Sequence, residues 1–354
     1  MSASDSSPVR VGIAGLGRSG WNIHAATLSL LPEKYSVVAV SDPDPKRLEE
    51  AREKFGCRTH STVEDLVADS NVELVVVATP SHLHAPHSIL ALKAGRHVVC
   101  EKPFALSVEQ ADEVIAAAKQ AGRIIAPFQN RRYDPVLLKV REIIHSGKLG
   151  RLLLFRLTAH NFMRRLDWQT LKRFGGGHLN NWGPHLIDIA LQFWPNGKEP
   201  RVVCQMERAL SAGDAEDHVK VILHGPGAPL LELEFTYACA YPQSAWLVMG
   251  THGGLSSDGK QVSWRWVDPA SLPERQASEA PPADRGYAAN TIEKLTYQEE
   301  TWNVPSREEH HPERLFYEDL YASVRSGAPL VVTPDSVRRQ IAVLDQCRKA
   351  ASEA

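Results

Sequence analysis

The chain has 354 residues, a formal net charge of −2 and a hydrophobic content of 43%. This length is too great for one ordinary core and suits two domains. The near balance of charge gives no general attraction to nucleic acid or to a membrane surface. No run of residues is long and apolar enough to span a bilayer.

Residues 1–8 are small and polar and contain no apolar stretch typical of a secretory signal. The five cysteines are scattered and form no C-x-x-C pair. This spacing favours reduced thiols over a disulfide framework or a zinc site. We therefore expect a cytoplasmic protein without a bound metal.

The first predicted strand starts at Val9 and ends in three glycines with the spacing G-x-G-x-x-G, namely Gly15, Gly17 and Gly20. A helix is predicted over residues 21–31. This order of strand, glycine turn and helix suits a dinucleotide pyrophosphate, because the backbone can approach the phosphates and the helix offers free N–H groups. A glycine-rich turn without a ligand is the alternative. We predict that the cofactor contacts Gly15, Leu16, Gly17, Arg18 and Ser19.

Asp42 directly follows the second predicted strand, Tyr35–Ser41. A carboxylate at this position can accept both ribose hydroxyls and would repel a 2′-phosphate, so we expect NAD rather than NADP. Ser41 and Arg47 are close enough in sequence to weaken that preference. The alternative role for Asp42 is that of a turn residue before Pro43.

Strands continue to alternate with helices as far as Phe128, with strands predicted over residues 73–78, 97–100 and 123–127. Apparent capping boxes begin at Ser61 and Ser107. The strands are continuously apolar, as in a parallel sheet that is covered on both faces. We therefore predict a doubly wound parallel sheet of the Rossmann type, with residues 1–128 forming a cofactor-binding domain.

Polar residues follow two further strands of this sheet, in Thr79–His84 and Glu101–Pro103. Ligands bind at the carboxyl edge of such sheets. We therefore add to the expected cofactor contacts Thr79, Pro80, His82, His84, Glu101 and Lys102. Lys102 could also stabilise a developing alkoxide, although a lysine beside a turn is usually a surface residue.

Beyond Phe128 the alternation ends. A helix is predicted over residues 135–147 and a strand over residues 151–160. Several strands then follow one another between residues 201 and 266, and residues 268–290 form a long excursion. Strands without intervening helices indicate an α+β domain with an open antiparallel or mixed sheet, which we assign to residues 129–330. The helix over about residues 331–354 is expected to pack back on the first domain.

A helix predicted after Gly175-Gly176-Gly177 carries His178, Asn181, His185 and Asp188 on one stripe. The stripe is either a structural network in which Asp188 orients His185, or a site in which His185 is a general base. A metal site ranks last, because no His-x-x-x-His pair or carboxylate triad supports it.

These segments together resemble the glucose–fructose oxidoreductase/inositol dehydrogenase (Gfo/Idh/MocA) family over nearly the whole chain. The resemblance rests on Glu101-Lys102-Pro103, on the helix from Gly175 to Asp188, on Arg131-Arg132-Tyr133-Asp134-Pro135 and on Gly250-Thr251-His252-Gly253-Gly254. It implies nicotinamide-dependent oxidation of a secondary alcohol on a sugar, cyclitol or related polyol. Lys102 would contact substrate and nicotinamide, and His185 would be the base. It also implies a large open, mostly antiparallel sheet that often pairs between subunits, and hence a homodimer or homotetramer.

One departure is Asn181, where the family usually has Asp. An amide cannot take up a proton, although it can orient a hydroxyl. His185 then acts alone or with another acid such as Asp188, or the substrate differs, or the chain binds its ligands without turnover. The expected substrate contacts are Arg132, Tyr133, His160, Arg164, Trp168, Asn181 and His185.

The leading hypothesis is an NAD-dependent sugar or polyol dehydrogenase. One alternative is a lyase or hydrolase that cleaves glycosides with a tightly bound, recycled NAD. The other is a sensor that binds NAD and a ligand without catalysis.

Overall fold

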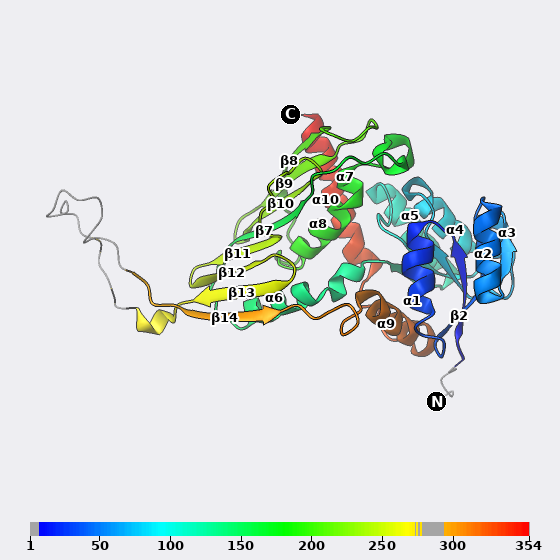
Figure 1. Ribbon diagram of the computed structural model, residues 1–354, viewed down its shortest axis with the longest axis horizontal. Coiled ribbons are helices and arrows are strands. Elements are labelled where there is room, and N and C mark those ends of the chain that lie inside the picture. The colour runs from blue at the N-terminus through cyan, green and yellow to red at the C-terminus, as the bar shows by residue number, and fades with distance from the viewer. Residues whose placement is uncertain (1–6, 273, 275–276, 278–293, 354) are drawn as a thin grey trace.

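The computed structural model describes residues 7–272, 274, 277 and 294–353. These residues form two sheets, one of six strands in the order β3-β2-β1-β4-β5-β6 and one of eight in the order β14-β13-β12-β11-β7-β10-β9-β8. We call the six-stranded sheet with its helices the N-terminal lobe, and the eight-stranded sheet with its helices the C-terminal lobe. Figure 1 shows the two lobes side by side, with the long C-terminal helix between them.

All neighbouring strands of the N-terminal lobe are parallel, so the predicted doubly wound sheet is confirmed. The apolar runs in β4 and β5 are buried, as expected of strands that helices cover on both faces. The strands are β1 (Val9–Ala14), β2 (Tyr35–Ser41), β3 (Arg58–His60), β4 (Leu74–Val77), β5 (His97–Cys100) and β6 (Ile125–Pro127). The helices of this part of the chain are α2 (Pro45–Phe55), α3 (Val63–Ala68), α4 (His84–Lys93) and α5 (Val108–Ala121).

The helix expected over residues 21–31 is present but shorter and of mixed type, since a π-helix, η1 (Gly20–Ala25), continues directly as α1 (Ala26–Leu28). The capping residue predicted for the helix that follows Ser61 was wrong. The capping residue of α3 is Thr62 instead of Ser61, and its hydroxyl accepts the N–H of Asp65. The predicted cap at Ser107 is confirmed, since its hydroxyl accepts the N–H of Gln110.

The eight-stranded sheet is mostly antiparallel, as the family resemblance implied, with one parallel pair between β7 and β10. Phe155, Leu157 and Ala159 of β7 (Leu152–His160) alternate inward and are buried, while the residues between them are partly exposed. One face of the sheet is therefore packed and the other is open. The remaining strands are β8 (Arg201–Glu207), β9 (His218–His224), β10 (Leu230–Thr236), β11 (Trp246–Gly250), β12 (Gly253–Ser257), β13 (Gln261–Trp266) and β14 (Gln298–Asn303).

Helices α6 (Pro135–His145), α8 (Gly183–Leu191) and α10 (Pro334–Ser352) contribute to the core on the packed face of this sheet. The helix predicted to run through residues 178–193 is interrupted at Trp182, which separates α7 (His178–Asn181) from α8. Pro184 lies in the first turn of α8, where its missing N–H costs nothing.

The last two helices pack against elements from earlier parts of the chain. Phe316 and Tyr317 of α9 (Pro312–Ser326) belong to the same hydrophobic cluster as the residues of β1. Ile341 of α10 packs in a cluster of the N-terminal lobe, while Leu344 packs in the core of the C-terminal lobe. The domain limits expected at residues 128 and 330 stay a prediction, and most of the excursion expected over residues 268–290 lies outside the described residues. Among the helices described, none has both the length and the apolar character needed to cross a membrane.

Candidate functional site

The glycine turn between β1 and η1 borders a cavity of about 600 Å³. Gly15 has a φ of +91°, and a Cβ there would lie 2.7 Å from the carbonyl oxygen of Ala78. A Cβ on Gly20 would lie 1.8 Å from the carbonyl oxygen of Gly15, so packing of the turn requires both glycines. Gly17 differs, because no atom of the described residues lies within 4 Å of a Cβ added there. Its missing side chain keeps the cavity open, which fits the close approach of a phosphate.

Asp42 lines this cavity and also holds the turn. Its carboxylate accepts the N–H of Leu16 at 2.7 Å and that of Asp44 at 2.9 Å, and Arg47 lies 3.4 Å away. Leu16 itself is buried in the core, so neither its side chain nor its N–H faces the cavity. Arg18 and Ser19, by contrast, line the cavity.

Glu101 joins the end of β5 to the glycine turn. Its carboxylate accepts the hydroxyl proton of Ser19 at 2.5 Å and the main-chain N–H of Lys102 at 2.9 Å, and it lies 3.2 Å from the ring of His24 in η1. The hydrogen bonds and charge of His24 hold the pKa of this buried carboxyl well below its usual range, against the effect of burial. Glu101 therefore lines the cavity and also positions the turn.

The residues after β4 are divided between the cavity and the protein interior. Thr79, Pro80 and His84 line the cavity. Both ring nitrogens of His84 lie 2.7 Å from main-chain oxygens, those of Thr79 and Pro103, so this side chain holds the two loops together. His82 instead packs against Phe174, with 5.3 Å between the ring centroids, and does not line the cavity.

Lys102 forms the direct polar link from this cavity to the C-terminal lobe. Its Nζ donates to the side-chain oxygen of Asn181 at 3.0 Å and to the main-chain oxygen of Asn181 at 3.1 Å. Burial lowers the pKa of Lys102 to about 8. The negative charge of Glu101 counteracts part of this effect, whereas the positive charges of Arg18, Arg165 and Arg131 add to it. The ammonium therefore persists at neutral pH but is easily discharged above it.

His185, one turn beyond Asn181, lines a second cavity of about 750 Å³ between the packed face of the eight-stranded sheet and the adjoining helices. Among the described residues, Nδ1 of His185 has no hydrogen-bond partner although it is buried. Burial lowers the pKa of His185 well below its ordinary value, and the positive charge of Lys102 lowers it further. The ring is therefore neutral and retains a lone pair that can accept a proton. Other residues that line this cavity are Arg131, His160, Trp182, Gln243 and Trp246.

The alternative in which Asp188 orients His185 does not hold, because Asp188 has another partner. Arg132 takes both oxygens of the Asp188 carboxylate, at 2.6 and 2.8 Å, in a buried bidentate ion pair. Tyr133 likewise points away from the cavities, since its hydroxyl donates to Asp319 of α9 at 2.7 Å. Arg132 and Tyr133, both expected to contact substrate, therefore hold the helices together and line neither cavity.

The loop over residues 161–174 faces the first cavity through different residues from those expected. Arg164 is exposed and donates to the carbonyl oxygen of Leu210, whereas Arg165, Asp167 and Trp168 line the cavity. Trp168, which we expected on the substrate side, therefore lies at the cavity beside the glycine turn. Arg165 pairs with Asp167 through two nitrogen–oxygen contacts of 2.8 and 2.9 Å.

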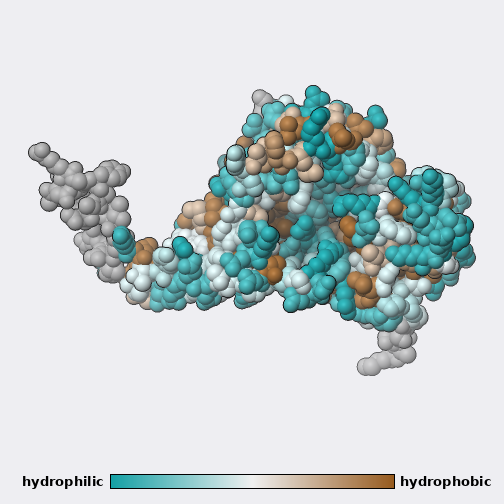
Figure 2. All heavy atoms as spheres, in the orientation of Figure 1, coloured by the Kyte–Doolittle hydropathy of each residue, from teal (hydrophilic) through white to brown (hydrophobic). Residues whose placement is uncertain are grey.

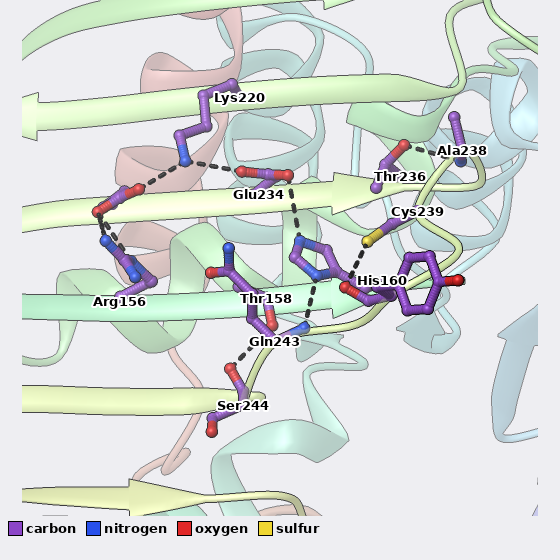
Figure 3. A network of polar contacts seen from close by, with 12 residues as sticks. Arg156, Thr158, His160, Lys220, Glu234, Thr236, Ala238, Cys239, Gln243 and Ser244 are labelled. Carbon is purple, nitrogen blue, oxygen red and sulfur yellow. Dashed lines mark hydrogen bonds and ion pairs between the residues drawn. The ribbon is translucent and has the colours of Figure 1, made fainter. Parts of the chain in front are cut away.

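His160 stands at the end of a polar network on the open face of the eight-stranded sheet (Figure 3). Lys220 contacts Glu234 at 2.7 Å, and Glu234 lies 3.2 Å from Nε2 of His160. Nδ1 of His160 accepts the N–H of Gln243 at 3.2 Å. Nδ1 is thus hydrogen-bonded, while Nε2 lies beside the Glu234 carboxylate without a hydrogen bond among the described residues. Through Nδ1, His160 fixes the segment around Gln243 that forms one wall of the second cavity.

Sequence reasoning missed Arg165, His24 and Tyr237. His24 and Arg165 act through contacts between segments distant in the chain, and no local pattern marks them. Tyr237 directly follows β10, and its hydroxyl accepts hydrogen bonds from Arg165 at 3.2 Å and from the amide nitrogen of Asn181 at 3.4 Å. Its place after a strand end is the signal in the sequence that marks it.

Two family models match the chain. The model described as an oxidoreductase family with an NAD-binding Rossmann fold matches residues 9–128, and the GFO/IDH/MocA C-terminal domain matches residues 137–256. Together they cover more than half of the chain.

Among curated proteins, the chain is 25% identical to the scyllo-inositol 2-dehydrogenase (NADP(+)) IolW of Bacillus subtilis, covering 98% of this chain and 94% of that protein. It is 26% identical to the trans-1,2-dihydrobenzene-1,2-diol dehydrogenase of Mus musculus, over 80% of this chain and 83% of that protein. A solved structure of the WlbA dehydrogenase from Bordetella pertussis, in complex with NADH and UDP-GlcNAcA, has the same fold, with a TM-score of 0.78, 21% identity and coverage of 99% and 97%.

Proposed function

Because this chain belongs to the GFO/IDH/MocA family of oxidoreductases, we propose that it oxidises a secondary alcohol of a sugar, cyclitol or glycoside with a nicotinamide dinucleotide as hydride acceptor. The observation that carries the proposal is the contact of Lys102 with Asn181, one turn before His185. This contact joins the cavity beside the glycine turn to the helix that bears the unpartnered imidazole.

The cofactor is assigned to the cavity of about 600 Å³ beside the glycine turn. Gly17 would let the pyrophosphate approach the backbone, and Arg18 would supply positive charge at the rim. Asp42 at the far end favours the ribose hydroxyls of NAD over the phosphate of NADP, although Arg47 at 3.4 Å offsets part of that preference. When bound there, NAD supplies the carbon that accepts the hydride.

Lys102 and His185 would have separate roles in the reaction. The Lys102 ammonium would donate to the reacting hydroxyl and stabilise the negative charge that develops on its oxygen. His185, kept neutral by burial, would take the hydroxyl proton. The aromatic rings of Trp182 and Trp246 and the polar rim around Gln243 give the second cavity the mixed lining that a sugar ring or cyclitol needs.

The test is turnover measured by the absorbance of reduced cofactor with a panel of sugars, cyclitols and glycosides. Lys102→Met and His185→Ala should each lower kcat by about 10²- to 10⁴-fold. The exposed Lys93→Met and His145→Ala are matched controls and should leave kcat unchanged. Unchanged turnover in Lys102→Met and His185→Ala would remove both residues from the mechanism.

The cofactor assignment has its own measurement, the quenching of tryptophan fluorescence on titration with NAD and with NADP. We expect the lower Kd for NAD. An equal or lower Kd for NADP would show that Arg47, and not Asp42, decides the choice. NAD that remains bound through purification, with glycoside cleavage in the absence of added NAD, would favour the alternative of a recycled cofactor.

A further inference from the structure

The side chain of Asn181 has two ends of nearly equal shape and opposite chemistry. Its oxygen accepts hydrogen bonds and its nitrogen donates them, whereas both oxygens of an aspartate accept. Lys102 has only donors, so only the oxygen end can bind it productively. A chain with Asn at this position therefore needs a device that sets the orientation of the amide.

The hydroxyl of Tyr237 lies at the other end of that amide. It accepts from Nδ2 of Asn181 at 3.4 Å and from Nη1 of Arg165 at 3.2 Å. Arg165 is a donor that cannot reverse its role, so at least one lone pair of the hydroxyl is always engaged. If Tyr237 used its proton to donate to Asn181, the amide nitrogen would have to turn toward the Lys102 ammonium.

A small chamber beside Tyr237 offers a different destination for that proton. The chamber holds about 10 Å³, close to the space of one water molecule. Three buried atoms around it have no hydrogen-bond partner within the described part of the chain, namely Nε2 of His178, Oε1 of Gln169 and Oγ of Ser211. The rings of His178 and Tyr237 are in contact, with centroids 4.1 Å apart.

His178 can serve as an acceptor in this chamber. Its side chain is 2% exposed, and burial lowers its pKa to about 3, which keeps the ring neutral. One water with bonds to His178, Gln169 and Ser211 would accept the Tyr237 proton and satisfy all three atoms.

We propose that Tyr237 is a positioning residue that directs its hydroxyl proton into this chamber, and thereby holds the Asn181 amide with its oxygen toward Lys102. The proposal deepens the function proposed above and rests on it for the importance of Lys102. According to this proposal, Tyr237 and the chamber that it shares with α7 help to determine the pKa of Lys102.

The consequence is measurable at Lys102 without turnover. The other charged groups that act on this ammonium are Glu101, which favours it, and Arg18, Arg165 and Arg131, which oppose it. In Tyr237→Phe the amide can turn its nitrogen toward Lys102, which removes one hydrogen bond to the ammonium. The pKa of Lys102 should then fall by about 0.5–1 unit.

The experiment is competitive labelling of the full chain with acetic anhydride between pH 6 and 10, read by mass spectrometry at Lys102. Tyr237→Phe should move the labelling midpoint to lower pH. Tyr241→Phe is the matched control, because Tyr241 is 91% exposed nearby in the chain, and it should leave the midpoint unchanged. Circular dichroism of each variant verifies the fold.

A double-mutant cycle separates amide orientation from general loosening. In the N181D background both carboxylate oxygens accept, so adding Tyr237→Phe should no longer lower the midpoint. An equal fall in both backgrounds, or no fall in the Asn181 protein, would overturn the proposal. Because labelling needs neither substrate nor cofactor, a chain that oxidises no polyol would refute the proposed function and leave this result standing.

Discussion

Lys102 and His185 show how one physical cause, burial, can prepare two bases for opposite roles. Burial lowers the pKa of Lys102 only to about 8, so that the ammonium persists at neutral pH. It lowers the pKa of His185 well below the ordinary value of 6.5, so that the imidazole is neutral. At pH 7 the pair therefore consists of a cation that can stabilise a negative oxygen and a neutral base that can take up a proton, which suits the alcohol oxidation proposed above.

The same pKa directions predict the pH dependence of the proposed turnover. Activity should fall as pH rises through about 8, because Lys102 then loses the proton with which it stabilises the alkoxide. Asn181→Asp places a negative charge about 3.0 Å from Nζ, which favours the ammonium. The alkaline limb should therefore move upward by about 1–3 pH units.

Initial rates between pH 6 and 10 check this prediction, and the position of the limb is the readout, whatever the absolute rate of the variant. Asn180→Asp is the neighbouring control, since the Asn180 side chain contacts Gly175, Gly176 and Arg348 instead of Lys102. If the limb of the Asn181→Asp protein coincides with that of the unaltered protein, another group is responsible for the loss of activity at high pH.

The sequence predicted the region of the candidate site better than it predicted the contacts of individual side chains. The region of the site followed from polar residues at strand ends, because parallel strands present those ends at one edge. The partner of each side chain did not follow. Arg132 is next in sequence to Arg131, which lines the second cavity, yet its guanidinium binds the carboxylate of Asp188 and does not line that cavity. Arg164 and Arg165 are adjacent in a loop, and only the folded chain decides which one faces the cavity.

Among the elements, the glycine turn gives the sharpest contrast between packing and ligand binding. Gly20→Ala would force a Cβ to within 1.8 Å of the Gly15 carbonyl oxygen, so the β1–η1 connection must shift and the chain should be destabilised. Gly17→Ala meets no atom within 4 Å and should fold as before. Its methyl group would instead occupy the space assigned to the pyrophosphate.

Thermal unfolding and NAD titration of the two variants separate these effects. We expect Gly17→Ala to keep its Tm within a degree or two and to bind NAD at least tenfold more weakly, a loss of about 1.4 kcal/mol. Gly20→Ala should lose Tm even without NAD. Unchanged NAD affinity in Gly17→Ala would place the dinucleotide elsewhere.

The elements that were predicted well are those in which local pattern and tertiary environment agree. The apolar runs of β4 and β5 read as covered strands because helices do cover them. The helix break at Trp182 was not visible, because the apolar spacing continues across it although the backbone does not. The π-helical form of η1 was not predicted either, because the composition of residues 21–31 indicates a helix without distinguishing its type.

At the scale of the molecule, α10 connects the two lobes. It lies between the lobes in Figure 1, and the space-filling view in Figure 2 is hollowed between them on the same face. Ile341 packs in the N-terminal lobe and Leu344 in the C-terminal lobe, less than one helical turn away. Neither lobe has a complete core without this helix, so the lobes should unfold as one unit.

This prediction is tested by Ile341→Ala and Leu344→Ala, each of which removes a fully buried side chain. Each variant should lose about 2–5 kcal/mol of unfolding free energy, while Lys349→Ala on the exposed side of α10 should lose little. Unfolding in urea is followed by two signals. NAD binding reports on the N-terminal lobe, and tryptophan fluorescence reports on the C-terminal lobe, whose tryptophans are Trp182, Trp194, Trp246, Trp264, Trp266 and Trp302. Because Trp21 packs in the N-terminal lobe and Trp168 lines the first cavity, both are replaced by Phe in the background protein. If α10 couples the lobes, both signals shift together in both variants. Separate midpoints, with Ile341→Ala affecting only NAD binding and Leu344→Ala only fluorescence, would mean that each lobe is stable without the other and that the Lys102–Asn181 contact forms between independently folded parts.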